Sequence, residues 1–173
     1  MINRELYMNR IRPFIGGELI KVMTGIRRSG KSVMLELIKE ELAEAGVAPS
    51  QMISINFEDM RYSHLQTATA LHDEIIKRAE GIEGKAYLFF DEIQRIDQWQ
   101  DAVNSFRVDF DCDIYVTGSN AYLLSSEYAT YLAGRSVEIK VLPLSFREFL
   151  DFHGYVVREN KSPAGGMRKR IYD

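Results

Sequence analysis

The chain has 173 residues, 46% of them apolar, which is enough for one substantial core and predicts a single α/β domain. Its formal net charge of −3 argues against a generally basic surface for nucleic acid, and its single cysteine, Cys112, excludes an internal disulfide framework. No apolar stretch approaches membrane-spanning length and the N-terminus lacks the apolar segment of a signal peptide, so we expect a cytoplasmic protein without a membrane partner.

The chain begins with a helical pattern and then a strand. Apolar residues recur at helical intervals over residues 2–12 and stop before Pro13, and residues 19–24 are an apolar run typical of a central strand. Directly after this strand comes the run GIRRSGKS at residues 25–32, which fits the phosphate-binding P-loop pattern G-x-x-x-x-G-K-[ST].

This P-loop pattern predicts a site for a nucleoside triphosphate. Its glycines let the backbone curl so that successive N–H groups point at the phosphates, and the positive end of the following helix reinforces that concavity. We expect Lys31 to reach the β- and γ-phosphates and Ser32 to offer its hydroxyl to Mg²⁺. The residues predicted to bind the nucleotide are Gly25, Arg28, Ser29, Gly30, Lys31, Ser32 and Val33. The alternative is a glycine-containing turn with a surface lysine.

Helices and strands continue to alternate in the middle of the chain. Apolar residues line one face of a helix over residues 34–45, and residues 52–57 form the second strand. Ser63 and Gln66 resemble a capping box for a helix whose apolar residues run from 68 to 79. Glu58 and Asp59, which close the second strand, stay unassigned because acids in such loops are usually solvated.

The third strand is an apolar run, residues 86–90, that ends in two acids. A run of this kind indicates a strand buried on both faces, as a parallel sheet requires, and its carboxyl end falls on the same side of the sheet as the P-loop. Asp91 is placed to hold the hydration shell of Mg²⁺, and Glu92 to polarise the water that attacks the γ-phosphate. The alternative for Glu92 is an acid that favours a helix N-terminus.

A helix around Trp99 leads to a fourth strand, residues 113–117, and residues 136–141 form a fifth. Five strands with intervening helices predict a doubly wound parallel sheet with right-handed crossovers. The fourth strand leads into TGSN at residues 117–120, where Ser119 is a candidate contact for the γ-phosphate or the attacking water. Ser119 is equally a good N-cap for a helix over residues 120–125.

Four motifs together resemble one family: GIRRSGKS, LFFDEIQ at 88–94, TGSN, and the pair LAGR at 132–135 with LPLSFREFL at 142–150. This set is similar to the prokaryotic AAA-type ATPases in which an AAA domain precedes an uncharacterised C-terminal domain. The resemblance implies a three-layer P-loop NTPase fold with a five-stranded parallel sheet of order 5-1-4-3-2. It also implies that a segment around residues 11–14 covers the adenine base.

The same resemblance implies an ATPase that uses ATP and Mg²⁺. Its expected catalytic residues are Glu92, Lys31, Arg135 and Ser119, and its metal ligands are Ser32 and Asp91. Arg135 is a candidate arginine finger or sensor, the alternative being a surface arginine that opens a strand. Hydrolysis would serve an unknown remodelling or regulatory task; a slow nucleotide-gated interaction switch is the alternative. Ser145 and Glu148 are explained better as a capping box of the last helix.

Two parts of the chain differ in character. We expect residues 1–152 to be the ATPase core, and residues 153–173 to be a basic tail or a linker to a further C-terminal region of the kind that family members have. Residues 155–173 carry five Lys or Arg and two acids. Such a tail fits a linker better than a nucleic-acid contact. Candidate partners are ATP or ADP, a second copy of the chain, and nucleic acid bound through the further region.

Overall fold

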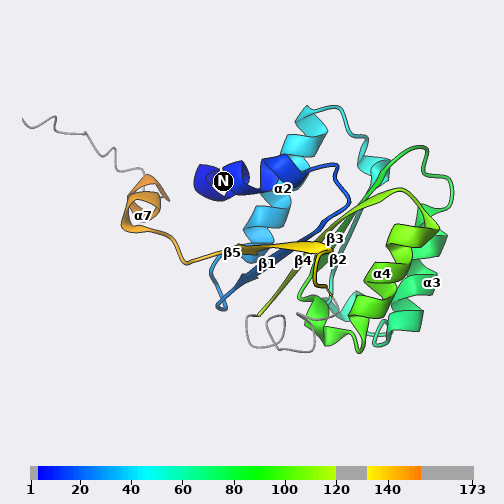
Figure 1. Cartoon of the computed structure of the whole chain (residues 1–173). Coiled ribbons are helices and arrows are strands. Elements are labelled where there is room, and N and C mark those ends of the chain that lie inside the picture. The colour runs from blue at the N-terminus through cyan, green and yellow to red at the C-terminus, as the bar shows by residue number, and fades with distance from the viewer. Residues whose placement is uncertain (1–3, 120–131, 153–173) are drawn as a thin grey trace, which may run out of the picture.

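Five parallel strands form the centre of the computed structural model, which describes residues 4–119 and 132–152. The strands are β1 (Ile20–Gly25), β2 (Met52–Asn56), β3 (Ala86–Asp91), β4 (Cys112–Ser119) and β5 (Ser136–Lys140). Their order in the sheet is β2-β3-β4-β1-β5, and each neighbouring pair is parallel (Figure 1). This is the order 5-1-4-3-2 read from the opposite edge, so the predicted fold is confirmed.

Helices cover both faces of the sheet and make the three layers. The helices α1 (Glu5–Ile11) and α2 (Lys31–Glu44) lie on one face, and α3 (Ala68–Ala79) and α4 (Trp99–Asp109) on the other (Figure 1). The last described helix, α7 (Phe146–Phe152), follows β5. Short 3₁₀ turns occupy Arg12–Phe14, Pro49–Gln51, Met60–Tyr62 and Ile93–Arg95.

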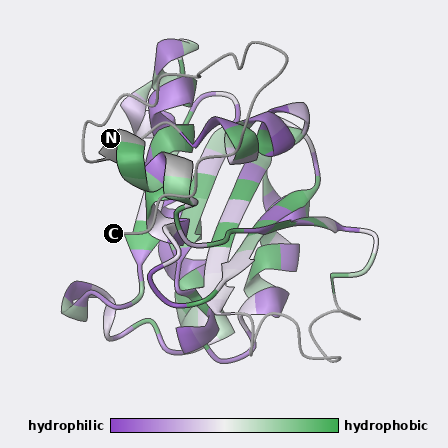
Figure 2. Ribbon diagram, turned by 90° about the vertical axis from the view of Figure 1, so that its left-hand side faces the viewer, coloured by the Kyte–Doolittle hydropathy of each residue, from purple (hydrophilic) through white to green (hydrophobic). Residues whose placement is uncertain are grey.

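The strands are buried on both faces because their alternate side chains enter two separate cores. Along β3, Leu88 and Phe90 pack on the side of α3 and α4, whereas Phe89 between them packs on the side of α1 and α2. There Phe89 stacks on Tyr115 of β4 with ring centroids 4.9 Å apart. Figure 2 shows apolar residues on the strands, and both apolar and polar residues on the helices. The prediction that β3 is buried on both faces is therefore confirmed.

A buried ion pair joins β1 and β4 at the amino end of the sheet. Lys21 Nζ contacts the Asp113 carboxylate, and both side chains are completely buried. The other oxygen of Asp113 accepts hydrogen bonds from the Tyr115 hydroxyl and the Gly16 amide, each at 2.7 Å. Burial lowers the pKa of Lys21 despite the opposing attraction of Asp113. Burial likewise raises the pKa of Cys112 to about 12, and this side chain packs against the core on the side of α3 and α4.

The start of α3 differs from the predicted capping box. Thr67 is the N-cap residue, and its hydroxyl accepts a hydrogen bond from the Ala70 amide at 3.3 Å. Gln66 instead donates from its side chain to the Ser63 carbonyl oxygen at 3.0 Å. The reason is tertiary: a parallel bridge between Thr67 and Asp97 holds this segment extended and delays the helix. The capping box at Ser63 was therefore wrong.

Some predictions lie outside the described residues. These are the helix over residues 120–125, for which Ser119 was the alternative N-cap, and the tail 153–173. Among the helices that are described, none is both long and apolar enough to cross a membrane.

Candidate nucleotide-binding site

The P-loop connects β1 to α2 through a turn that requires glycine at both ends. At Gly25 the backbone has φ of +156°, and a Cβ atom there would lie 2.2 Å from the Val141 carbonyl oxygen. At Gly30, the N-cap residue of α2, φ is +94°, a left-handed conformation. Arg28 between them is also left-handed, with φ of +63°. Strain of this kind costs about 1–3 kcal/mol for a residue with a side chain and is concentrated at functional sites.

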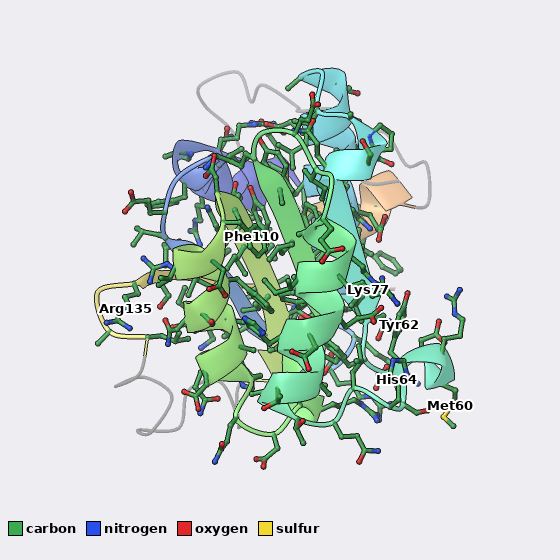
Figure 3. The ribbon with its side chains drawn as sticks, turned by 90° about the vertical axis from the view of Figure 1, so that its right-hand side faces the viewer. Met60, Tyr62, His64, Lys77, Phe110 and Arg135 are labelled. Atoms are coloured by element: carbon green, nitrogen blue, oxygen red, sulfur yellow. The ribbon has the colours of Figure 1, made fainter. Side chains whose placement is uncertain are left out.

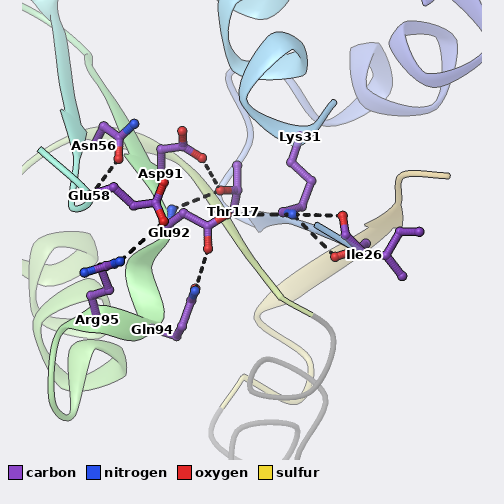
Figure 4. A network of polar contacts seen from close by, with 10 residues as sticks. Ile26, Lys31, Asn56, Glu58, Asp91, Glu92, Gln94, Arg95 and Thr117 are labelled. Atoms are coloured by element: carbon purple, nitrogen blue, oxygen red, sulfur yellow. Dashed lines mark hydrogen bonds and ion pairs between the residues drawn. The ribbon is translucent and has the colours of Figure 1, made fainter. Parts of the chain in front are cut away.

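Lys31 begins α2 and is only 5% exposed. Its ammonium lies 3.4 and 3.3 Å from the carbonyl oxygens of Gly25 and Ile26, which are long contacts, and 3.7 Å from Glu92 Oε1 (Figure 4). Within the described part of the chain, the buried Ser29 hydroxyl has no hydrogen-bond partner. The loop therefore holds a buried cation with weak contacts and an unsatisfied hydroxyl, and both suit a phosphate ligand.

Thr117 of β4 fixes both acids at the end of β3. Its hydroxyl donates to Asp91 Oδ1 at 2.5 Å and accepts from the Glu92 amide at 3.1 Å (Figure 4). Asp91 is 6% exposed, so its orientation is fixed by this bond within the core. The TGSN motif contained Thr117, but sequence reasoning gave it no role. The register of β3 with β4, which pairs Phe90 with Val116, is the signal that would have found it.

Glu92 turns into the pocket because its own backbone is left-handed, with φ of +55° and ψ of +46°. Its Oε2 accepts a hydrogen bond from Gln94 Nε2 at 2.5 Å, and its Oε1 faces Lys31. Glu92 precedes only the single 3₁₀ turn Ile93–Arg95, and its side chain makes no capping bond there. The alternative of a helix N-terminal acid therefore does not describe its contacts.

Lys31 and Glu92 line one pocket of about 540 Å³ at the carboxyl ends of the strands, whereas the predicted site residues Gly25, Ser29 and Asp91 lie outside its lining. Its lining residues are Arg27, Arg28, Gly30, Lys31, Ser32, Val33, Glu58, Glu92 and Ser119. Among the described lining residues, the cations come from the P-loop and its helix, and the carboxylates follow the ends of β2 and β3. Glu58, which sequence reasoning left unassigned, is paired with Arg95 at 3.3 Å.

The polarity of this pocket fits a phosphate chain with a divalent cation. The cationic P-loop side suits phosphate oxygens, and hydroxyl and carboxylate oxygens such as those of Ser32 and Asp91 are the ligands that Mg²⁺ prefers. Ser119 ends β4 directly opposite Gly25 in the sheet register and also lines the pocket. Strand β4, which lies next to the P-loop strand β1, thus brings Ser119 to the edge of the pocket. A contact of Ser119 with the γ-phosphate or the attacking water stays a prediction.

Arg135 does not join this group. It precedes β5, which runs parallel to β1 with Ser136 opposite Ile20, so Arg135 lies at the amino end of the sheet. Gly25 is five residues farther along β1, about 17 Å at 3.3 Å per residue. The exposed side chain of Arg135 extends from the segment before β5 toward Asn104 of α4, with Nη1 3.5 Å from Asn104 Oδ1 (Figure 3). Arg135 therefore lies at the opposite end of the sheet from the P-loop and does not line the pocket of its own chain.

The segment expected to cover the adenine base also lies elsewhere. Ile11 is completely buried in the core between α1 and α2. Arg12 pairs with Glu41 of α2 at 2.8 Å, and Glu41 lies ten residues beyond Lys31, about 15 Å along the helix. Among the described N-terminal residues, Arg4 touches the P-loop, with its Nη1 donating to the Ser29 carbonyl oxygen at 2.7 Å. Nothing in the sequence distinguished Arg4 from a surface arginine.

Comparison with known proteins finds a matching family and related sequences. The model of the family described as "AAA domain" matches residues 18–150. An uncharacterized protein of Haemophilus influenzae is 45% identical over 150 residues, which is 87% of this chain and 38% of that protein. The uncharacterized protein MJ1544 of Methanocaldococcus jannaschii is 37% identical over 163 residues, 94% of this chain and 34% of that protein. The chain thus spans little more than a third of these relatives.

Two solved structures share the fold. The Orc1 protein of Aeropyrum pernix, solved in complex with DNA, matches with a TM-score of 0.59 and 16% identity over 89% of this chain and 50% of that one. The Cdc6p protein of Pyrobaculum aerophilum matches with a TM-score of 0.60 and 13% identity over 88% of this chain and 48% of that one. At these identities the likeness extends to the fold alone.

Proposed function

The chain belongs to the AAA domain family, and from this premise we propose that its pocket binds Mg-ATP and hydrolyses it. The observation that carries the proposal is the meeting of Lys31 and Glu92 across one pocket, with their charged atoms 3.7 Å apart. One comes from the P-loop helix and the other from the end of β3. This brings together a cation for phosphate binding and a carboxylate able to accept a proton from water.

Each residue has a distinct task in this proposal. The P-loop amides and Lys31 bind the phosphates. Ser32 and Asp91 would hold Mg²⁺, which would neutralise charge on the phosphates. Glu92 accepts the proton of the attacking water, and Thr117 keeps both acids in place. Ser119, at the end of β4, contacts the γ-phosphate or that water.

The role of Asp91 predicts a loss that depends on the metal. Asp91→Asn removes the negative charge but keeps the size of the side chain. We therefore expect the gain in ATP affinity that Mg²⁺ provides to be about 10-fold smaller than in the parent. Titration calorimetry with ATP, with and without Mg²⁺, measures this. Asp59→Asn is the control, since Asp59 is the N-cap residue of the 3₁₀ turn Met60–Tyr62 and pairs with Arg61. An unchanged metal dependence in Asp91→Asn would remove Asp91 from the metal site.

For Arg135 we propose a role in the pocket of a second copy of the chain, because the topology keeps it from its own. We expect Arg135→Ala to leave the affinity for ATP unchanged and to lower ATP turnover about 10-fold, only at protein concentrations at which copies associate. Turnover measured against concentration, with sedimentation on the same samples, checks this. Equal turnover of variant and parent in the associated state would leave Arg135 a surface residue.

A second candidate function is a nucleotide-gated switch with slow turnover. The specific observation in its favour is the engagement of the Glu92 carboxylate, with Gln94 on one oxygen at 2.5 Å and Lys31 beside the other. A base held in this way is less available to water. Hydrolysis by the parent chain under single-turnover conditions separates the two functions, since a switch retains its ATP for many minutes.

The task that ATP serves is a matter for longer proteins, because this chain spans little more than a third of its relatives. We propose that residues 1–152 are the ATPase core and that residues 153–173 are a basic linker. We also propose that ATP serves a remodelling or regulatory task and that further regions contact nucleic acid. The DNA in the Orc1 structure makes nucleic acid a reasonable partner to test.

A further inference from the structure

A buried arginine stands at the meeting point of three segments that are far apart in the sequence. Arg4 is 2% exposed, and its guanidinium lies 4.4 Å from the centre of the Tyr7 ring. Nη1 donates to the carbonyl oxygen of Ser29 at 2.7 Å, Nη2 to that of Leu142 at 2.8 Å, and Nε to Glu148 Oε1 at 3.0 Å. One planar group thus joins the P-loop, the segment after β5, and α7.

On the P-loop side, Arg4 supports the turn from which α2 begins. Ser29 immediately precedes Gly30, and a Cβ atom at Gly30 would lie 3.1 Å from Arg4 Nη1. The guanidinium therefore packs against the backbone where the phosphate-binding amides start. Because its donors are arranged in a rigid fork, the guanidinium cannot follow a shift of the Ser29 carbonyl without changing its other two bonds.

On the other side, the same guanidinium reaches the start of α7. Glu148 Oε1 accepts the hydrogen bond from Arg4 Nε, and Glu148 Oε2 accepts one from the Ser145 amide at 2.7 Å. In return, Ser145 Oγ accepts a hydrogen bond from the Glu148 amide at 3.2 Å. The predicted capping box is thus present and is also an anchor for Arg4. Burial raises the pKa of Glu148, but the hydrogen bonds from Ser145 and Arg4 outweigh this effect and lower it overall. The amide of Leu142 further donates to the Tyr7 hydroxyl at 3.0 Å.

We propose that Arg4 is a positioning residue that couples nucleotide binding at the P-loop to the anchoring of α7. The proposal rests on the proposed function, because it needs a nucleotide in the pocket. A phosphate chain that draws in the amides around Gly30 tightens the Ser29 turn, and the buried guanidinium transmits that change to Glu148. Such a coupling is reciprocal, so loosening α7 weakens nucleotide binding in the same proportion.

The test combines nucleotide affinity with hydrogen exchange of the α7 amides in the 173-residue chain. In the parent we expect saturating Mg-ATP to slow exchange of the α7 amides at least about 5-fold, the lower end of typical couplings between sites. Glu148→Gln retains a capping box, because glutamine also serves at that position, but loses the charged partner of Arg4. We expect this variant to fold, to bind Mg-ATP about 5-fold more weakly, and to lose the effect of nucleotide on α7.

Two further variants separate the coupling from simple stability. Ser145→Ala weakens the cap of α7 but leaves the pair of Arg4 with Glu148, so exchange becomes faster overall while the nucleotide effect persists. Arg4→Gln removes the donors to all three segments and should weaken Mg-ATP binding by about 10-fold or more. Because Glu148→Gln leaves Arg4 and both its carbonyl contacts in place, it tests the link even where Arg4→Gln does not fold.

The outcomes distinguish this coupling from the function on which it rests. A parent chain that binds no Mg-ATP overturns both the function and the coupling. A parent that binds Mg-ATP but shows no change in α7 exchange overturns the coupling alone. A full nucleotide effect in Glu148→Gln overturns it as well, and loss of the effect in Glu148→Gln but not in Ser145→Ala supports it.

Discussion

Replacing Lys31 with alanine should weaken Mg-ATP binding by about 100-fold or more. The ammonium is 5% exposed and its contacts with two carbonyl oxygens are long, so the phosphates would become its principal partners. Charge-assisted hydrogen bonds of this kind contribute roughly 1.5–3 kcal/mol each, and about 2.7 kcal/mol corresponds to 100-fold in affinity. Titration calorimetry of parent and variant measures the ratio directly.

The matched control for this substitution is Lys39→Ala on the same helix. Lys39 pairs with Glu36, three residues earlier, and does not line the pocket. This variant removes the same charge from α2 without touching the phosphate site, so we expect it to bind Mg-ATP as the parent does. Equal affinity of the parent and the Lys31→Ala chain would contradict the assignment of the P-loop as the phosphate site.

Replacing Glu92 with glutamine should leave ATP bound but lower its turnover by about 100-fold or more. Glutamine keeps the size of the side chain and an oxygen that accepts from Gln94, but it cannot take a proton from water. General base catalysis typically contributes 10²–10⁴-fold, which sets the expected loss. Single-turnover hydrolysis with ATP bound to every molecule isolates this step from binding.

Glu58→Gln provides the comparison, because Glu58 also lines the pocket with a carboxylate and is paired with Arg95. We expect this variant to hydrolyse ATP within about 3-fold of the parent, because Glu58 has no part in the proposed proton transfer. Were Glu92→Gln to turn over ATP at the parent rate, Glu92 would lose its proposed role. The switch with slow turnover would then be the better account.

The fold and the centre of the site were predictable because their signals are local. The P-loop glycines are needed for a backbone conformation that Gly30 adopts and for a close approach that Gly25 makes to the Val141 carbonyl. Apolar runs such as β3 predict burial on both faces without knowledge of their neighbours. Asp91 and Glu92 come at the end of that run. Their position at the same edge of the sheet as the P-loop could therefore be predicted from the parallel arrangement of the strands alone.

The remaining residues depend on contacts between distant segments. Thr117 acts through the register of β4 against β3, and Arg4 through bonds to residues 25 to 144 positions away. Arg135 belongs to a conspicuous motif, but the strand that follows it begins at the far end of the sheet. At Thr67, a bridge to Asp97 overrides the local capping signal. No short pattern carries information of this kind, because the interactions are set by packing.

Titration of Mg-ATP into the 173-residue chain is the measurement that tests the central claim most directly. The account predicts saturable binding of one nucleotide per chain, strengthened by Mg²⁺ and weakened by about 100-fold or more in the Lys31→Ala variant. Absence of binding by the parent at millimolar Mg-ATP would contradict the claim that the pocket between the P-loop and Glu92 is a nucleotide site.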